Sequence, residues 1–263
     1  MTNNVHKIAI TTGDIDGIGT EITAKALAAI KPAKDVTFYL WRSNACPPEH
    51  LRLLDRHFNR TTVSTWQEAF QTHPKNYKTL IDICSNTTPA HWFETTAQAC
   101  MFHKLDGVVT GPISKHTILN AGMRDIGHTG ILRRVSGVDH LFMTFIGEKF
   151  NVLLITGHIP IEAVSSALTV ERVLAALRIA NQMRSLLPKE KGKLPICLVG
   201  VNPHSGEDGL LGKDEVQVLR PAIEKAALEK IACSEPMVPD VAFSKDNWQK
   251  YSFYVCPYHD QGL

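Results

Sequence analysis

The sequence predicts an α/β protein with a largely parallel sheet. Short apolar runs rich in β-branched and aromatic residues alternate with longer segments of helical periodicity. Several of the short runs are apolar without alternation, which is typical of strands covered on both faces. The chain has 263 residues, of which 44% are hydrophobic and 21% are charged. At about 150 residues per domain, this length fits one large domain or two small ones.

Eight segments are predicted to be strands. They are residues 6–11, 36–41, 79–83, 106–110, 140–146, 151–156, 195–201 and 252–256. The two strands within 140–156 are separated by little more than Gly-Glu-Lys, which predicts a local hairpin in the alternation of strands and helices. A Gly-Pro turn within 111–116 ends the fourth strand, and we expect a domain boundary there.

Four longer segments between the strands are predicted to be helices. They are residues 19–30, 91–105, 170–187 and 212–230. The third has apolar residues at a spacing of 3.6, and Thr169 stands where an N-cap is expected. The fourth contains Pro221, at which we expect a kink.

Composition argues against several classes of partner. Lys and Arg number 28 against 26 Asp and Glu, so bulk charge selects neither nucleic acid nor an anionic membrane. No run approaches 18 apolar residues, and the N-terminal segment lacks the basic and apolar parts of a secretory signal. The six cysteines form no CxxC and lie mostly in apolar runs, which predicts buried reduced thiols and a cytoplasmic location.

Three histidines follow three different predicted strands. His158, His204 and His259 each come within a few residues of a strand's carboxyl end. In open α/β sheets, ligands bind beyond these ends, so the imidazoles converge if the strands are neighbours. Taken one at a time, each histidine is better explained as a turn or surface residue than as a metal ligand. Their separations of 46 and 55 residues also match no local metal motif.

A cluster of three imidazoles has a clear chemical use. Neutral histidines suit Zn²⁺, Co²⁺ and related ions, and three protein ligands leave a position open for water or substrate. An ion held in this way can polarise a substrate oxygen. Asp260 is a candidate acceptor for the second ring nitrogen of its neighbour His259. A zinc hydrolase is the alternative from another class, although no strong general-base motif accompanies the histidines.

The glycine-rich segment after the first strand is not a phosphate-binding loop of a familiar kind. It lacks both GxGxxG and the GK[ST] of a P-loop. Its acidic residues, Asp14, Asp16 and Glu21, would repel a phosphate. We interpret it as a tight turn in which Gly17 and Gly19 permit close packing, with a ligand-contacting loop as the alternative.

His128 and Thr129 form a second polar candidate site. They stand at the start of a predicted helix over 129–136, whose free N–H groups favour an anion such as a phosphate. The alternative is a capping threonine beside a surface histidine.

Together these segments resemble the 4-hydroxythreonine-4-phosphate dehydrogenase family of vitamin B6 biosynthesis. In chain order the matching motifs are TTGDIDGIGTEI, VVTGPISK, AGMRDIGHTG, ITGHIP, GVNPHSGEDG, VPDVAF and PYHDQGL. They run from about residue 8 to the last residue, and the NPHSGE and YHDQGL segments are the most specific.

The resemblance implies an isocitrate/isopropylmalate-dehydrogenase-like fold rather than a Rossmann fold, with two α/β domains, a cleft between them and a homodimeric assembly. We expect the first domain to span residues 1–112. The second, residues 113–263, would carry the metal ligands and the dimer interface. The family chain continues beyond YHDQGL, so we expect this chain to be C-terminally truncated relative to the family. Both domains would then be incomplete, and the first would lack its returning C-terminal segment.

The resemblance also implies roles for particular residues. It assigns a divalent metal, which is zinc, magnesium or cobalt, to three ligands: His158, His204 and His259. It places His128 and Thr129 in contact with the phosphorylated substrate, and Asp240 in VPDVAF matches a family acid near the site. Gly130 departs from the family pattern, which usually has Glu at this position.

The implied reaction is the NAD- or NADP-dependent oxidation of 4-phosphohydroxy-L-threonine to a 3-keto acid. That product decarboxylates to 3-amino-2-oxopropyl phosphate, a precursor of pyridoxal 5′-phosphate. Two alternatives remain open: a related 4-phospho-sugar-acid dehydrogenase, and a non-catalytic homologue that binds metal and a phosphorylated ligand.

Overall fold

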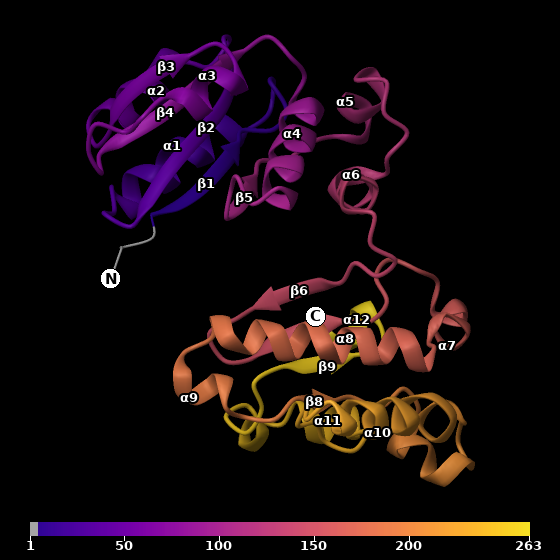
Figure 1. Cartoon of the computed structure of the whole chain (residues 1–263). Helices are drawn as coiled ribbons and strands as arrows, with labels where there is room; N and C mark the ends of the chain where they lie inside the picture. Colours follow the sequence, from indigo (N-terminus) through magenta and orange to yellow (C-terminus); the bar gives the residue numbers. More distant parts are fainter. Residues whose placement is uncertain (1–4) are drawn as a thin grey trace. The chain divides into compact units, whose positions relative to one another are not determined.

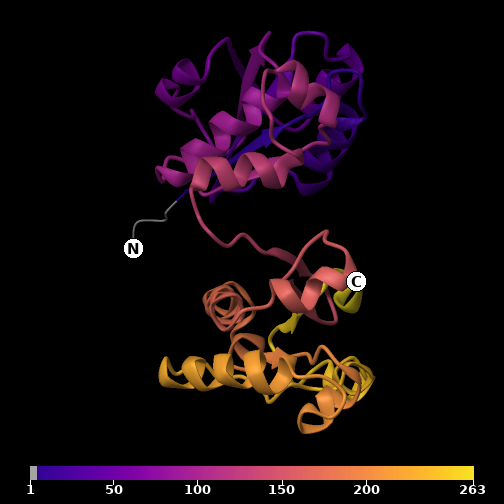
Figure 2. The same ribbon diagram turned by 90° about the vertical axis from the view of Figure 1, so that its right-hand side faces the viewer.

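The computed structural model describes residues 5–263, and residues 1–4 of the N-terminal segment considered above lie outside the described part. The chain divides into two compact units, Met1–Asp139 (unit 1) and His140–Leu263 (unit 2). Each unit contains its own sheet and its own helices (Figures 1 and 2).

Unit 1 alternates strands and helices, as the sequence predicts. Its elements are β1 (His6–Thr11), α1 (Gly19–Ile30), β2 (Val36–Ser43), α2 (Pro48–Asp55), β3 (Asn59–Val63), α3 (Trp66–Gln71), β4 (Thr79–Ser85), α4 (Pro89–Met101), β5 (Gly107–Thr110), α5 (Lys115–Asn120) and α6 (Gly127–Ser136). The five strands form one sheet in the order β3-β4-β2-β1-β5, and every neighbouring pair is parallel.

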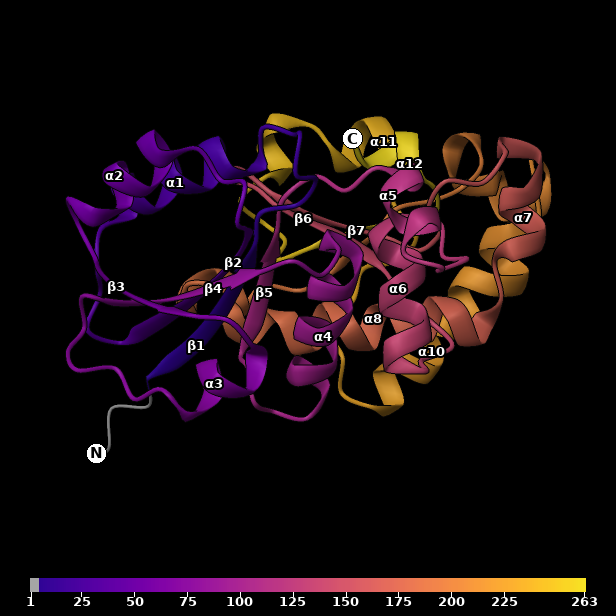
Figure 3. The same cartoon turned by 90° about the horizontal axis from the view of Figure 1, so that it is seen from above.

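Helices cover both faces of this sheet, which explains its apolar strands. Figure 3 shows α1 and α2 on one face and α3 and α4 on the other. Because side chains alternate along a strand, Leu40 and Leu80 pack with α1 and α2, whereas Tyr39 and Ile81 pack with α3 and α4. The prediction of a sheet buried on both faces is therefore confirmed for unit 1.

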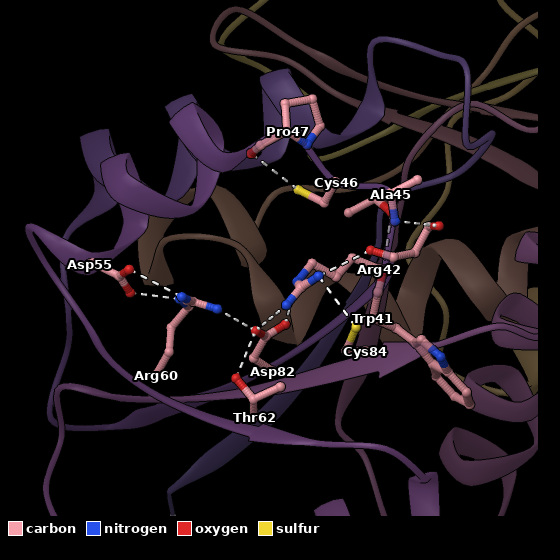
Figure 4. A network of polar contacts seen from close by, with 12 residues as sticks. Trp41, Arg42, Ala45, Cys46, Pro47, Asp55, Arg60, Thr62, Asp82 and Cys84 are labelled. Atoms are coloured by element: carbon pink, nitrogen blue, oxygen red, sulfur yellow. Dashed lines mark hydrogen bonds and ion pairs between the residues drawn. The ribbon is translucent and has the colours of Figure 1, made fainter.

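A buried network of charges lies within this sheet. Asp82 of β4 is fully buried and accepts two hydrogen bonds from the guanidinium of Arg42, at 2.8 and 2.9 Å. Arg60 also donates to Asp82, and its other nitrogens bind the more exposed Asp55 (Figure 4). Thr62 adds a hydroxyl bond of 3.2 Å to the same carboxylate. Asp82 is therefore fully bonded inside the sheet.

Unit 2 combines a smaller sheet with several short helices. Its elements are β6 (Met143–Ile146), β7 (Asn151–Leu154), η1 (Ile161–Ala163), α7 (Val164–Ala167), α8 (Val170–Met183), η2 (Arg184–Leu186), α9 (Lys189–Gly192), β8 (Cys197–Leu198), η3 (Pro203–Gly209), the π-helical η4 (Glu215–Leu219), α10 (Arg220–Leu228), α11 (Pro239–Ala242), η5 (Lys245–Asn247), β9 (Tyr254–Cys256) and α12 (His259–Gly262). The strand order is β6-β7-β9-β8.

The sheet of unit 2 is mixed. β6 and β7 form the predicted hairpin and are antiparallel, whereas β7, β9 and β8 are parallel to one another. One face packs against α8 and α10 through residues such as Leu177 and Ala222, and the other packs around Tyr254 and Ala242. The six cysteines are free, and burial raises the pKa of Cys197 and Cys233 to about 12.

Several boundaries differ from the predicted ones. The segments 6–11 and 19–30 match β1 and α1, but only Cys197–Leu198 of the predicted strand 195–201 lies in a sheet. The strand β3 was not predicted, because its sequence NRTTV is polar. Thr169 caps α8 as expected, accepting a bond of 3.1 Å from the N–H of Arg172.

Pro221 does not interrupt its helix in the predicted way. The residues before it form the π-helical turn η4, and α10 begins at Arg220, which puts the proline in its first turn. A proline is tolerated there because the N–H groups of a first turn need no partner inside the helix.

Along the chain, the division between the two compact units falls after Asp139, whereas the sequence predicts a domain boundary after residue 112. The intervening helices α5 and α6 pack on α4 of unit 1, where Ile118 and Ile131 are fully buried against Phe93. This apolar contact assigns residues 113–139 to unit 1 by packing. The expected domain division at residues 112 and 113 stays a prediction.

We expect Asp82→Asn to destabilise unit 1 by about 3–5 kcal/mol, because the buried Arg42 loses its compensating charge. Asp55→Asn removes the exposed partner of Arg60 and should cost no more than about 1 kcal/mol. Urea unfolding followed by tryptophan fluorescence measures both, since unit 1 holds three of the four tryptophans, Trp41, Trp66 and Trp92. Equal losses in the two variants would contradict this account.

Candidate functional site

The carboxyl ends of β1 and β5 form the first candidate site. The two strands pair in parallel, and the N–H of Gly111 extends the pairing by donating to Thr11 O at 2.6 Å. The N–H of Asp14 then donates to Pro112 O at 2.8 Å. The loops that follow the two strands are therefore fastened together by backbone hydrogen bonds.

Glycines permit this close approach. Gly13 has a φ of +77°, and a Cβ there would lie 2.2 Å from Pro112 O. A Cβ on Gly19 would lie 1.5 Å from Thr12 O, so α1 could not begin where it does with any other residue. The interpretation of this segment as a tight turn is confirmed at Gly19.

Asp14 is held in this turn by one of its two carboxylate oxygens. Oδ2 accepts a hydrogen bond of 2.9 Å from the N–H of Ser114. Oδ1 is buried and has no hydrogen-bond partner. A buried polar atom without a partner is uncommon in folded proteins, so this oxygen is a candidate contact for a ligand.

His128 faces the same turn from α6. The helix begins at Gly127, two residues before the predicted start, so His128 belongs to its first turn and Thr129 is not its cap. The imidazole packs edge-on against Phe93 at 4.8 Å, and its Nε2 is buried without a partner. Burial lowers the pKa of His128, while the Gly111 carbonyl and the Asp14 charge act in the opposite direction.

The ends of β7 and β9 form the second candidate site. Their parallel pairing continues past the strands, because Ile155 N–H donates to Cys256 O at 2.8 Å and Thr156 hydroxyl donates to Pro257 O at 2.7 Å. This pairing brings His158 and His259 together, with ring centroids 4.8 Å apart. The predicted convergence of strand-end histidines is therefore observed for two of the three.

The two imidazoles line a cavity of about 380 Å³. Its wall consists of Gly157, His158, Ile159, Ile161, Val164, Tyr258, His259 and Asp260. Asp260 bonds to Nδ1 of His259 at 2.6 Å, the acceptor role considered for it from the sequence. This contact orients the ring and leaves Nε2 of His259 available to a ligand.

His204 does not join this pair. Residues His204–Asp208 all have φ between +42° and +79°, a left-handed turn that directs the imidazole to Glu207 at 2.6 Å. The side chain of His204 is 71% exposed. Residues 5–263 contain no group of three His, Cys, Asp or Glu side chains placed to hold a metal ion. The three-histidine ligand set therefore stays a prediction.

Glu215 was not identified from the sequence but holds the segment before His204. It is fully buried, and its Oε1 accepts bonds of 2.7 Å from the N–H groups of both Val201 and Asn202. Its Oε2 accepts a third bond from the Asn202 amide at 2.9 Å. In the sequence, Glu215 occupies an ordinary polar position of a predicted amphipathic helix, so no pattern could have revealed this contact.

The two remaining predicted site residues, Asp240 and Thr129, both lie on the surface. Asp240 lies in α11, is exposed, and is not among the residues that line the cavity beside His158 and His259. Thr129 is also exposed.

Within the described part of the chain, no helix combines the length and apolarity needed to cross a bilayer.

Comparisons with known proteins match nearly the whole chain. The family model described as pyridoxal phosphate biosynthetic protein PdxA matches residues 56–263. The 4-hydroxythreonine-4-phosphate dehydrogenase of Sulfurihydrogenibium sp. (strain YO3AOP1) is 30% identical over 268 residues, which cover 98% of this chain and 81% of the relative. The protein of the same name from Aquifex aeolicus (strain VF5) is 30% identical over 269 residues, with the same coverage.

A solved structure agrees at the level of the fold. The crystal structure of a 4-hydroxythreonine-4-phosphate dehydrogenase from Burkholderia phymatum matches with a TM-score of 0.79 at 20% identity. The match covers 98% of this chain and 82% of that chain, so the α/β fold is shared along almost all of the sequence.

The lowered pKa of His128 predicts how unit 1 responds to acid. An unfolded histidine titrates near pH 6.5, so below this pH the unfolded chain takes up a proton before native His128 does. The contribution of His128 to stability is therefore present above about pH 6.5 and is lost as the pH falls toward its native pKa. Histidine NMR signals should place that pKa below about 6.5, and His128→Gln should weaken the acid dependence of unfolding. A native pKa at or above the ordinary value would contradict the assignment.

Proposed function

Because the chain belongs to the family of the pyridoxal phosphate biosynthetic protein PdxA, we propose that it is a 4-hydroxythreonine-4-phosphate dehydrogenase that uses NAD or NADP. The secondary alcohol of 4-phosphohydroxy-L-threonine loses a hydride to the nicotinamide and a proton to solvent, which leaves a 3-keto acid. The β-keto acid then loses CO₂ and takes up a proton to give 3-amino-2-oxopropyl phosphate.

The observation that best supports this proposal is the pairing of His158 with His259. These residues lie in the ITGHIP and PYHDQGL segments, far apart in sequence, and the parallel strands β7 and β9 bring their rings to 4.8 Å. Two neighbouring imidazoles beside a cavity of about 380 Å³ suit an ion and a small substrate.

Whether a divalent metal fits here depends on which histidine nitrogens are free to bind it. Nδ1 of His259 is bonded to Asp260, so its Nε2 can serve as a ligand atom, and His158 lies beside it. We propose His158, His204 and His259 as the ligand set, in which His204 takes part only if its segment leaves the left-handed conformation. When bound, zinc, magnesium or cobalt would supply Lewis-acid polarisation of the substrate hydroxyl.

The chain's own residues would bind and orient the substrate. We propose that His128 and Thr129 contact the phosphorylated substrate, because both stand in the first turn of α6, where backbone N–H groups are free. Asp240 is proposed as an acidic residue near the reacting groups, on the resemblance of VPDVAF alone. Its exposed position leaves it free to approach a substrate.

The finer features implied by the family are part of the same proposal. They are an isocitrate/isopropylmalate-dehydrogenase-like fold, a domain division at residues 112 and 113, a homodimer and a cytoplasmic location. The chain spans 81% of the length of the relatives from Sulfurihydrogenibium and Aquifex. Because it is shorter than these relatives, its activity has to be measured on this chain itself.

We expect 4-phosphohydroxy-L-threonine to drive NADH or NADPH formation, followed at 340 nm, when a divalent metal is supplied. Removing the metal with a chelator should abolish the rate, and adding the metal back should restore it, because alcohol activation needs the ion. Metal binding without any reduced nicotinamide would instead favour the non-catalytic homologue.

Each proposed ligand is tested by its alanine variant. His158→Ala, His204→Ala and His259→Ala should each lower the affinity for metal by at least about tenfold, measured by elemental analysis after dialysis. His116→Ala is the matched control, since His116 is exposed and belongs to unit 1, whereas the proposed ligands belong to unit 2. An unchanged metal content in His204→Ala would remove that residue from the set.

A further inference from the structure

A pocket of about 400 Å³ lies at the amino ends of β1 and β2, on the face of the sheet that packs against α3. All the residues that line it belong to unit 1. The first candidate site lies at the opposite end of β1, and this strand of six residues is about 16 Å long. The pocket shares no residue with either candidate site, so its ligand is not the substrate of the proposed reaction.

The strand register gathers the polar groups of the pocket on one face. Lys7 of β1 pairs with Thr37 of β2, and Tyr39 faces the same way because side chains alternate along a strand. Lys34 comes from the turn before β2, and residues 72–77 come from the loop after α3. Three segments that are distant in sequence therefore contribute to one pocket.

Aromatic rings form the apolar wall of the pocket. Tyr39 and Phe70 stack with their centroids 5.7 Å apart, and Trp66 packs against both rings. Tyr39 is only 3% exposed, whereas Tyr77 is 45% exposed. The wall is therefore anchored in the core at its inner end and open to solvent at its rim. Such a surface suits a flat ring, since aromatic groups pack well in stacked or edge-on contacts.

Two lysines give the pocket a positive charge. Lys7 and Lys34 both line it, and none of the described lining residues is an Asp or a Glu. The ammonium of Lys7 lies 5.7 Å from the centroid of Phe70. Asp106, the acid that acts on Lys7, accepts its main-chain N–H at 2.7 Å and also lies 3.7 Å from His6. Neither lysine side chain forms an ion pair within residues 5–263, so both are available to an anion.

The hydroxyl of Tyr39 adds a neutral donor. Burial raises the pKa of this phenol, so it stays protonated at neutral pH. No hydrogen bond joins the hydroxyl to another residue in the described part of the chain. A buried tyrosine usually has such a partner, and an oxygen of a bound anion would supply it here.

We propose that this pocket binds a small aromatic phosphate, a molecule with one flat ring and one phosphate group. The ring packs against Phe70 and Tyr77, and the phosphate accepts hydrogen bonds from both ammonium groups and from the Tyr39 hydroxyl. Charge-assisted bonds to phosphate are about twice as strong as neutral ones. A volume of about 400 Å³ lies within the range of small-molecule sites.

The probe is phenyl phosphate, and its two halves, inorganic phosphate and phenol, are the control ligands. Titration calorimetry on the full chain measures each Kd, and amide NMR signals locate the bound molecule. Phenyl phosphate should bind with a Kd below about 1 mM, at least about tenfold more tightly than either half, because ring and phosphate are bound together. It should shift the amide signals of Thr37, Phe70 and Tyr77.

Three substitutions test the assigned contacts. Lys7→Gln and Lys34→Gln should each weaken phenyl phosphate binding at least about threefold, because each removes one charged donor. Tyr39→Phe keeps the stacked ring and should weaken binding about three- to tenfold. Lys75→Gln is the matched control, since Lys75 is exposed in the loop after α3 but does not line the pocket, and it should change the Kd by less than about twofold. Thermal melting checks that each variant is folded.

The wild-type chain decides the proposal independently of the variants. No binding of phenyl phosphate, or binding no tighter than that of inorganic phosphate, overturns it. Binding that shifts only signals of α6 residues would place the probe at the proposed phosphate contact of the substrate and would also overturn it. An equal loss in Lys75→Gln and in the two lysine variants would show a general attraction of anions to this face rather than a pocket built for one ligand.

Discussion

The hydrogen bonds between parallel strands, continued one or two residues past the strand ends, position both candidate sites. In unit 1 they fasten the turn at Asp14 to the loop at Ser114, and in unit 2 they align Thr156 with Pro257. Side chains that follow neighbouring parallel strands then share one edge of the sheet. His158 and His259, 101 residues apart in sequence, meet for this reason alone.

Three buried or half-buried carboxylates differ in how completely they are hydrogen-bonded. Asp82 is fully paired with arginines, and Glu215 is fully bonded to backbone and amide N–H groups. Both hold structure, since all their oxygens are occupied. Asp14 alone among these three keeps one oxygen without a partner. The two fully buried and fully bonded carboxylates hold the fold, whereas the half-buried Asp14 is only partly bonded.

The match between predicted and observed elements follows from how strongly each segment is patterned. Residues 6–11 and 19–30 were predicted with the bounds of β1 and α1, because an apolar run and a glycine turn mark them. The strand β3 escaped prediction because Asn59–Val63 is polar and depends on pairing with β4. The segment 195–201 has the apolar pattern of a strand, yet only two of its residues pair within the sheet.

The amino-acid sequence by itself determined the fold class, the family and the identity of the candidate residues, because these depend on local pattern and on short motifs. Only the tertiary structure decided which of those residues meet. It joined His158 to His259 through β7 and β9, and it turned His204 toward Glu207 through a left-handed segment. It also left one oxygen of Asp14 without a partner. These outcomes depend on strand order, backbone conformation and contacts between distant segments, which no local pattern encodes.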